Sequence, residues 1–293
     1  MQAKVGNKNY INKQILENDF KIKKKFGQNF LTDQNILNEI VESADLNNEI
    51  AVIEIGPGLG SLTERLVSKA GFVLCYEIDD EVIPLLKKNL SDYNNYCVIN
   101  KDILDVDINL DIDNYLKDYK KIYVVANLPY YITTPIILGL LSKTDKIDRY
   151  VMMMQKEVAD RICGKPKTKD YNALSIAIQY RCEAKKIINV PRTVFIPSPN
   201  VDSAIVRLNK YIEKPYKSLN EEFFFEFIRL CFSQRRKTLL NNLSNKYEKD
   251  DILKMLKSLN IKENVRSEEL DINDFINLSD YIIENEGFLK WLR

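Results

Sequence analysis

Histidine is absent from this chain of 293 residues, and cysteine is scarce. The lack of histidine excludes Ser-His-Asp triads and zinc sites that depend on imidazole ligands. The five cysteines are odd in number and never stand at CxxC spacing, which argues against a disulfide framework or a thiolate metal site. We therefore expect reduced thiols, no bound metal, and chemistry performed by carboxylates, amides, aromatic rings or an organic cofactor.

A long apolar run is also missing. No stretch approaches the roughly 20 apolar residues that a membrane helix needs. The first ten residues, MQAKVGNKNY, contain no apolar signal-peptide core. These two absences predict a cytoplasmic protein that makes no contact with a membrane.

Neither sign of charge is in large excess, and the formal net charge is only +1. The cations are nevertheless clustered along the chain. Residues 1–28 contain seven lysines against Glu17 and Asp19, and residues 229–246 contain five cations and no acidic residue. Two basic patches on a nearly neutral protein suit local contact with phosphates. A solvated helix surface explains either patch alone equally well. The candidate phosphate contacts in the second patch are Arg235, Arg236 and Lys237.

What the sequence does contain is a regular alternation of short apolar runs with helical patterns. The predicted strands are 51–55, 72–77, 96–99, 121–126, 149–154, 185–190 and 203–208. The predicted helices are one capped by Asp33 with apolar positions between 36 and 44, then 61–70, 81–90, 134–142 and 171–179. Such alternation predicts an α/β fold, with a Rossmann-like parallel sheet covered by helices on both faces. The last two strands are expected to close the sheet as an antiparallel edge.

The pattern changes after residue 211, where a Lys-Pro-Tyr linker at 214–216 precedes an all-helical tail. The predicted helices of this tail are 221–231, 237–245, 250–259 and 274–284. We place a domain boundary near residue 212. The expected organisation is a basic, partly mobile segment over 1–25, an α/β domain over 26–212 and a small all-helical domain over 213–293.

The segment 52–63, VIEIGPGLGSLT, forms a glycine-rich turn between a strand and a helix. Its three glycines would let the backbone approach a bound ligand closely, although a tight turn without a ligand has the same pattern. Glu77 ends the next strand, 21 residues after Gly56, where a carboxylate can accept hydrogen bonds from both hydroxyls of a ribose. Glu54, just before the glycines, suits a cationic ligand such as S-adenosylmethionine better than the pyrophosphate of a dinucleotide.

Two further polar positions follow the third and fourth strands. Asp102 could accept from an adenine amino group, or it could simply cap a helix. Asn127-Leu128-Pro129-Tyr130 lies at a strand's carboxyl end, where open parallel sheets bind ligands. The Asn127 side-chain oxygen and a backbone carbonyl of Leu128 or Pro129 could draw the hydrogens of an adenine amino group out of plane. Tyr130 offers a flat face on which a base can stack; a strand-ending turn with a packed tyrosine is the alternative.

A second aromatic candidate, Phe195, precedes the loop 196–203, IPSPNVDS. Its two prolines stiffen this loop and restrict where the ring points. We expect Phe195 to close the other side of a base held by Tyr130, with a buried loop anchor as the competing interpretation.

Five motifs stand in the order found in ribosomal RNA adenine dimethyltransferases. They are FGQNFL at 26–31, IEIGPGLGSLT at 53–63, DIL at 102–104, NLPYYITTP at 127–135 and FIPSPNVDS at 195–203. The chain resembles this family over roughly residues 20–245, and most closely its KsgA type, which modifies small-subunit ribosomal RNA.

The resemblance implies an S-adenosylmethionine pocket and a base-facing loop. The implied cofactor residues are Asn29, Leu31, Gly56, Glu77, Asp102 and Asn127, of which Asn29 and Leu31 rest on resemblance alone. The residues implied to face the adenine are Asn127, Leu128, Pro129, Tyr130 and Phe195. The implied activity is dimethylation of two adjacent adenosines near the 3′ end of small-subunit rRNA, by a monomer acting on a partly assembled subunit.

Three alternatives remain at this point. Erm-type methyltransferases of large-subunit rRNA share the chemistry but usually contain N-I-P-Y or N-I-P-F. DNA adenine methyltransferases typically contain D-P-P-Y or N-P-P-Y, so Leu128 argues against them. A non-catalytic RNA-binding assembly factor on the same scaffold is disfavoured by the presence of Glu77, Asn127 and Tyr130.

Overall fold

The computed structural model describes Val5, residues 8–11, Lys23 and residues 27–285. The segment 1–25, which we expect to be basic and partly mobile, lies outside the described residues apart from those few positions. No helix within the described ranges is long and apolar enough to cross a membrane.

The chain divides into two compact units, which we describe separately. The first unit comprises Met1–Ala159 and Ala184–Lys210, and the second comprises Asp160–Glu183 and Tyr211–Arg293. The division at Lys210 lies close to the boundary that we placed near residue 212. Asp160–Glu183, which we expected in the α/β domain, groups instead with the helical unit. The reason is burial, since Tyr171, Ile176 and Tyr180 pack into the second unit's hydrophobic core.

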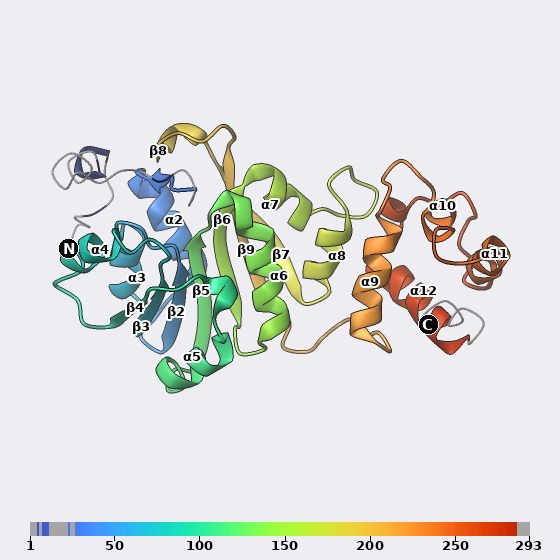
Figure 1. The fold of residues 1–293 in the computed structure, drawn as a ribbon, viewed down its shortest axis with the longest axis horizontal. Coiled ribbons are helices and arrows are strands. Elements are labelled where there is room, and N and C mark those ends of the chain that lie inside the picture. The colour runs from blue at the N-terminus through green and yellow to red at the C-terminus, as the bar shows by residue number, and fades with distance from the viewer. Residues whose placement is uncertain (1–4, 6–7, 12–22, 24–26, 286–293) are drawn as a thin grey trace. The chain divides into compact units, whose positions relative to one another are not determined.

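A seven-stranded sheet forms the centre of the first unit, in the order β4-β3-β2-β5-β6-β9-β7 (Figure 1). Its strands are β2 (Ile50–Ile55), β3 (Phe72–Tyr76), β4 (Tyr96–Ile99), β5 (Lys121–Asn127), β6 (Arg149–Gln155), β7 (Cys182–Val190) and β9 (Ser203–Lys210). The pairs from β4 to β6 are parallel, and β9 pairs antiparallel with β6. This is the predicted Rossmann-like α/β sheet, with β9 inserted between β6 and β7.

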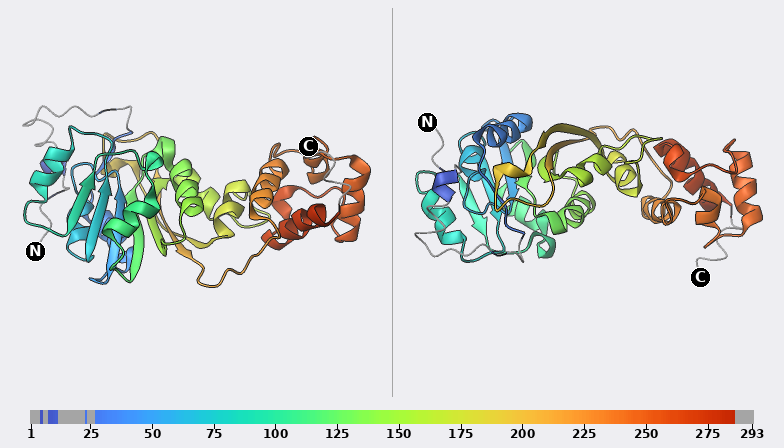
Figure 2. Two further views of the ribbon diagram at one scale, coloured as in Figure 1. Left: turned by 60° about the horizontal axis from the view of Figure 1, so that its bottom comes forward. Right: turned by 90° about the horizontal axis from the view of Figure 1, so that it is seen from above.

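Helices cover both faces of this sheet (Figures 1 and 2). They are α2 (Gln34–Ala44), α3 (Thr63–Val67), α4 (Ile83–Asn89), α5 (Ile108–Tyr115) and α6 (Thr133–Lys143). The short helix α7 (Lys156–Ile162) contains the division between the two units. Short 3-10 turns occur at Ile103–Asp105, Tyr130–Ile132 and Arg192–Val194. We did not predict α5 and α7, because each is short and lacks a clear apolar face.

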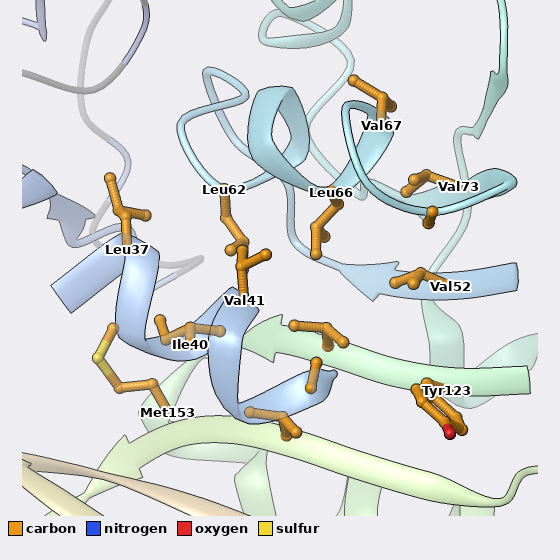
Figure 3. Close-up of a cluster of buried hydrophobic side chains, with 14 of the residues drawn as sticks. Leu37, Ile40, Val41, Val52, Leu62, Leu66, Val67, Val73, Tyr123 and Met153 are labelled. Carbon is orange, nitrogen blue, oxygen red and sulfur yellow. The ribbon is translucent and has the colours of Figure 1, made fainter. Parts of the chain in front are cut away.

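The start of α2 follows its sequence pattern closely. Asp33 caps the helix, and its carboxylate accepts from the backbone N–H groups of Asn35 at 2.8 Å and Ile36 at 3.1 Å. Leu37 and Ile40 then pack against the sheet beside Leu62 and Leu66 (Figure 3). Burial of each such side chain contributes about 1.5–3 kcal/mol to stability.

A small antiparallel pair joins two distant segments of the first unit. β1 (Phe30–Leu31) pairs with β8 (Phe195–Ile196), so that Leu31 lies opposite Phe195. The pairing is extended by the Thr32 N–H, which donates to the Val194 carbonyl at 2.9 Å. Strands of two residues carry no periodicity, so the sequence did not predict them.

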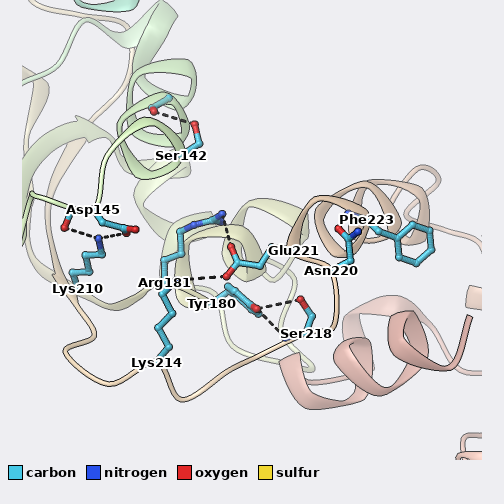
Figure 4. Close-up of polar contacts among 11 residues, drawn as sticks. Ser142, Asp145, Tyr180, Arg181, Lys210, Lys214, Ser218, Asn220, Glu221 and Phe223 are labelled. Atoms are coloured by element: carbon cyan, nitrogen blue, oxygen red, sulfur yellow. Dashed lines mark hydrogen bonds and ion pairs between the residues drawn. The ribbon is translucent and has the colours of Figure 1, made fainter. Parts of the chain in front are cut away.

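The second unit is helical, as predicted. It contains α8 (Ala173–Gln179), α9 (Glu221–Cys231), α10 (Leu239–Leu243), α11 (Lys249–Ser258), α12 (Ile272–Glu284) and a 3-10 turn at Ser267–Glu269. Phe224, Phe227 and Phe275 are almost fully buried in its core. Polar contacts join the 160–183 segment to α9 and the chain before it. Arg181 pairs with Glu221 at 3.2 Å, and the Ser218 N–H donates to the Tyr180 hydroxyl oxygen at 3.0 Å (Figure 4).

Candidate active site

A pocket opens at the carboxyl ends of β2, β3, β4 and β5, where open α/β sheets bind ligands. It encloses about 1040 Å³ of space, including the part open to solvent. The predicted residues that line it are Asn29, Leu31, Gly56, Glu77, Asp102, Asn127, Leu128, Pro129 and Tyr130.

Gly56 and Gly58 of the glycine-rich turn line the pocket. Gly56, Gly58 and Gly60 have φ angles of 68°, 55° and 91°, which side chains rarely adopt. A Cβ at Gly56 would meet no atom within 4 Å, so this backbone faces open space. A Cβ at Gly60 would lie 2.8 Å from the Leu86 side chain. One glycine therefore leaves room for a ligand, and another allows the turn to pack on α4.

Glu77 follows β3 and is only 6% exposed. One carboxylate oxygen accepts from the Gly58 N–H at 3.1 Å, and the other accepts from the Asp79 N–H at 2.9 Å. Burial raises the pKa of Glu77, while these backbone hydrogen bonds act in the opposite direction. Glu77 also lines the pocket, so its carboxylate is placed where it can accept from the hydroxyls of a ribose.

Glu54 lies on the pocket wall at the end of β2 and is 1% exposed. Burial raises its pKa from 4.5 to about 8. The Cys75 thiol donates to this carboxyl across 3.8 Å. A cation bound beside this buried carboxyl would favour its ionised form and lower its pKa.

Asp102 has two roles available to it. One oxygen accepts from the Leu104 N–H at 2.9 Å and so caps the 3-10 turn, which is the alternative that we weighed. The residue also lines the pocket beside Ile78, whose side chain is 41% exposed. Capping by one oxygen leaves the other as a possible acceptor for an adenine amino group.

The Asn127 amide is oriented by a distant segment. Its Nδ2 donates to the Asn29 carbonyl at 3.2 Å, which leaves Oδ1 as the acceptor. The Pro129 carbonyl accepts twice, from the Thr133 hydroxyl at 2.9 Å and the Ile132 N–H at 3.3 Å. Within residues 27–285, no donor is paired with the Leu128 carbonyl. Of the two carbonyls that the sequence left open, Leu128 is therefore the better partner for Asn127.

The aromatic candidates lie in different environments. Tyr130 lines the pocket, and its hydroxyl is hydrogen-bonded to Ser203. Burial raises the pKa of its phenol above the usual value. Phe195 is 3% exposed and belongs to the hydrophobic core, and it is not among the residues that line the pocket. This placement favours the anchor interpretation of Phe195, and its contact with a base stays a prediction.

The structure adds pocket residues that the sequence did not single out. Gln28 and Tyr131 both line the pocket, and Tyr131 is 56% exposed. Gly27 has a φ of 62°, and a Cβ there would lie 3.1 Å from the Tyr131 ring. The sequence shows a second tyrosine directly after Tyr130 and a Gly27-Gln28 pair. It does not show that these two segments lie side by side, because they are far apart in the chain.

The predicted phosphate contacts lie together in the second unit. Arg235, Arg236 and Lys237 are exposed in the loop between α9 and α10. The Arg235 guanidinium donates to the Lys169 carbonyl. Buried Asn242 holds the start of the loop, because its Oδ1 accepts from the Gln234 N–H at 3.2 Å.

The fold and the pocket define a class I methyltransferase of the Rossmann-like type. The model of the family described as "Ribosomal RNA adenine dimethylase" matches residues 19–284 of the chain. The chain therefore belongs to this family of ribosomal RNA adenine dimethyltransferases.

Curated relatives named "Ribosomal RNA small subunit methyltransferase A" are similar over nearly their whole length. The protein from Bacillus mycoides (strain KBAB4) is 48% identical over 269 residues, which cover 90% of this chain and 92% of the relative. The protein from Geobacillus sp. (strain WCH70) is 49% identical over 274 residues, which cover 92% and 94%.

Two solved structures are also similar. A dimethyladenosine transferase from Plasmodium falciparum has a TM-score of 0.72 and 30% identity, covering 87% of this chain and 97% of its own. The 23S rRNA methyltransferase ErmE has a TM-score of 0.65 and 27% identity, covering 86% and 98%. Both similarities span the two units of this chain.

Proposed function

We propose that this protein transfers methyl groups from S-adenosylmethionine to the N6 amino nitrogens of two adjacent adenosines near the 3′ end of small-subunit rRNA. The assignment to the small subunit is supported by the names of relatives at 48–49% identity, whereas the large-subunit enzyme ErmE is 27% identical. A partly assembled small subunit is the proposed substrate, and a cytoplasmic monomer is the proposed form of the enzyme.

The pocket residues fit S-adenosylmethionine. The open backbone at Gly56 can approach the ligand, Glu77 can accept from the ribose, and Asp102 can accept from the adenine amino group. Glu54 supplies a carboxyl near the ligand's positive charge. Asn29 and Leu31 form the part of the wall that comes from the N-terminal side. When bound, the cofactor supplies a methyl group already activated by a sulfonium, so the protein must mainly supply alignment.

The observation that carries the proposal is the acceptor pair at the end of β5. The lone pair of an adenine amino group is conjugated into the ring, which makes the nitrogen a poor nucleophile. Asn127 Oδ1 and the Leu128 carbonyl can accept both amino hydrogens and hold the nitrogen out of conjugation. Tyr130 can stack on the base and fix its plane. After transfer, the nitrogen loses its surplus proton to water, and no histidine base is needed.

A second transfer to the same nitrogen needs space rather than another catalytic group. The monomethylated nitrogen still carries one hydrogen and a lone pair. One of the two acceptors can therefore orient it while the first methyl group occupies the other position. The helical unit binds the RNA phosphates through the exposed cations Arg235, Arg236 and Lys237.

The proposal is tested with small and large ribosomal subunits from cells that lack the gene. Each is incubated with the protein and a labelled methyl donor, and the modified bases are mapped by mass spectrometry. We expect dimethylated adenosines on the small subunit only, and a transfer rate at least about a hundredfold lower with Asn127→Ala. Label on large-subunit adenosines alone would favour the Erm-type activity. Cofactor binding without transfer to either subunit would favour a non-catalytic assembly factor.

A further inference from the structure

Asp79 is a fully buried carboxylate that lies two residues beyond Glu77 and outside the predicted site. One of its oxygens accepts from the Lys23 ammonium at 2.7 Å, and the other accepts from Gln28 Nε2 at 2.6 Å. Its backbone N–H donates to Glu77 at 2.9 Å. A buried charge with this many partners is well determined in position.

Gln28 continues the connection toward the reaction loop. Its Oε1 accepts from the Lys23 backbone N–H at 2.8 Å, so both ends of its amide are engaged. The next residue, Asn29, presents the carbonyl that accepts from Asn127 Nδ2 at 3.2 Å. The Asn29 side chain is itself tied to the Gly27 carbonyl at 3.0 Å. A chain of contacts thus runs from Glu77 to Asn127, through segments about 50 to 100 positions apart in the sequence.

Lys23 is held by this network rather than presented to solvent. Its ammonium also pairs with Glu81 at 3.0 Å. The hydrogen bond to Asp79 raises the pKa of Lys23, with a smaller contribution from Glu81. Although Lys23 belongs to the lysine cluster that we considered for phosphate contact, its charge is already matched by two carboxylates.

We propose that Asp79 is a positioning residue for Asn127, acting through Gln28 and the Asn29 carbonyl. This inference rests on the proposed function. The Asn127 amide must present Oδ1, and not Nδ2, to the adenine amino group. The Asn29 carbonyl enforces that orientation by accepting from Nδ2, and Asp79 holds the segment that carries this carbonyl. A displacement of about 1 Å in such a group can lower the rate of reaction a hundredfold.

The first test is Asp79→Asn. The new side chain has one oxygen that accepts and one NH₂ group that donates, so it can no longer accept from both Lys23 and Gln28. We expect the single-turnover rate of methyl transfer, at saturating cofactor and RNA, to fall by at least about tenfold. The double variant Asp79→Asn with Gln28→Glu exchanges donor and acceptor and should restore much of this rate. Glu81→Gln is the matched control, because it removes the exposed partner of Lys23 and leaves Gln28 untouched.

A double-mutant cycle with Asn127→Ala distinguishes a role of Asp79 in positioning Asn127 from a general disturbance of the structure. If Asp79 acts through Asn127, Asp79→Asn should lower the rate little further once Asn127 is absent. Additive losses would overturn the proposal, as would a wild-type rate for Asp79→Asn at saturation. If Asp79→Asn fails to fold, Gln28→Met carries the test, since it breaks the same connection and leaves Asp79 paired with Lys23.

A measurement without RNA separates this inference from the proposed function. The Asn127 side-chain amide signal is assigned in ¹⁵N nuclear magnetic resonance spectra by its loss in Asn127→Ala. We expect it to shift in Asp79→Asn and in Gln28→Met, to return toward its original position in the exchanged pair, and to stay unchanged in Glu81→Gln. An unmoved signal in the first two variants would overturn the inference. Absence of methyl transfer by the wild-type protein, with the shift present, would count against the proposed function alone.

Discussion

At the scale of single residues, the site depends on which polar atoms the protein has already paired. Both carboxylate oxygens of Glu77 accept from backbone N–H groups, which fixes the carboxylate where it lines the pocket. The Pro129 carbonyl is occupied twice, so Leu128 is the better acceptor beside Asn127. Protein contacts of this kind orient each functional group before the substrate arrives, and such preorganisation lowers the barrier to reaction.

Glu77→Ala should weaken S-adenosylmethionine binding by about 1–3 kcal/mol, because two ribose hydroxyls lose a charged acceptor. Isothermal titration calorimetry measures this directly, with Glu49→Ala on the protein surface as the control. The melting temperature should be recorded as well, because the Gly58 and Asp79 N–H groups also lose their acceptor. An unchanged affinity would remove Glu77 from the ribose role.

Glu54 predicts a dependence of stability on pH. Because burial raises its pKa from 4.5 to about 8, the folded protein keeps this proton over a range in which the unfolded chain has lost it. Folding then takes up a proton, and the free energy of unfolding falls by about 1.4 kcal/mol per unit as the pH rises through this range. Glu54→Gln stays neutral and should lack this slope.

Urea unfolding between about pH 5 and pH 8 measures the difference between the two proteins. We expect the stability of Glu54→Gln relative to the wild type to increase steadily with pH. Parallel stability curves over this range would show that the Glu54 carboxyl titrates normally.

At the scale of elements, the two-residue strands β1 and β8 decide where Leu31 and Phe195 lie. Their pairing draws both side chains into the core beneath α2 rather than leaving Phe195 on the loop surface. It also brings the N-terminal segment to the pocket, where Asn29 contacts Asn127. One short pairing thus serves both the core and the site.

Phe195→Ala should therefore lower the stability of the protein by about 3–5 kcal/mol, the usual loss for a buried phenylalanine. Thermal and urea unfolding measure this loss. Val201→Ala, in the same loop but 45% exposed, is the matched control and should change little. A normal melting temperature with weaker RNA binding would support the base-stacking role instead.

At the scale of the whole molecule, a net charge of +1 conceals a basic loop in the helical unit. Replacing Arg235 and Arg236 with glutamine should weaken RNA binding across sequences and reduce its salt dependence by about two units of slope or less. Filter binding at several salt concentrations measures the slope. The control is Lys254→Gln with Lys257→Gln on α11, which removes the same charge elsewhere in the unit. Equal effects of the two pairs would mean that only overall charge matters.

The sequence alone determined the α/β order, the glycine-rich turn and the polar residues that end successive strands. These features are local: the helical spacing of α2, its Asp33 cap and the apolar strands are visible within a few residues. The carboxyl ends of parallel strands meet at one edge, so Glu77, Asp102 and Asn127 could be expected together.

Only the tertiary structure decided the contacts between distant segments. The link from Asp79 through Gln28 to Asn29, the burial of Phe195, the double pairing of the Pro129 carbonyl and the grouping of Asp160–Glu183 with the helical unit belong to this class. Each depends on single hydrogen bonds or side-chain packing between positions far apart in the chain. Such contacts arise when the sheet and helices pack, and they leave no periodicity or local motif in the sequence.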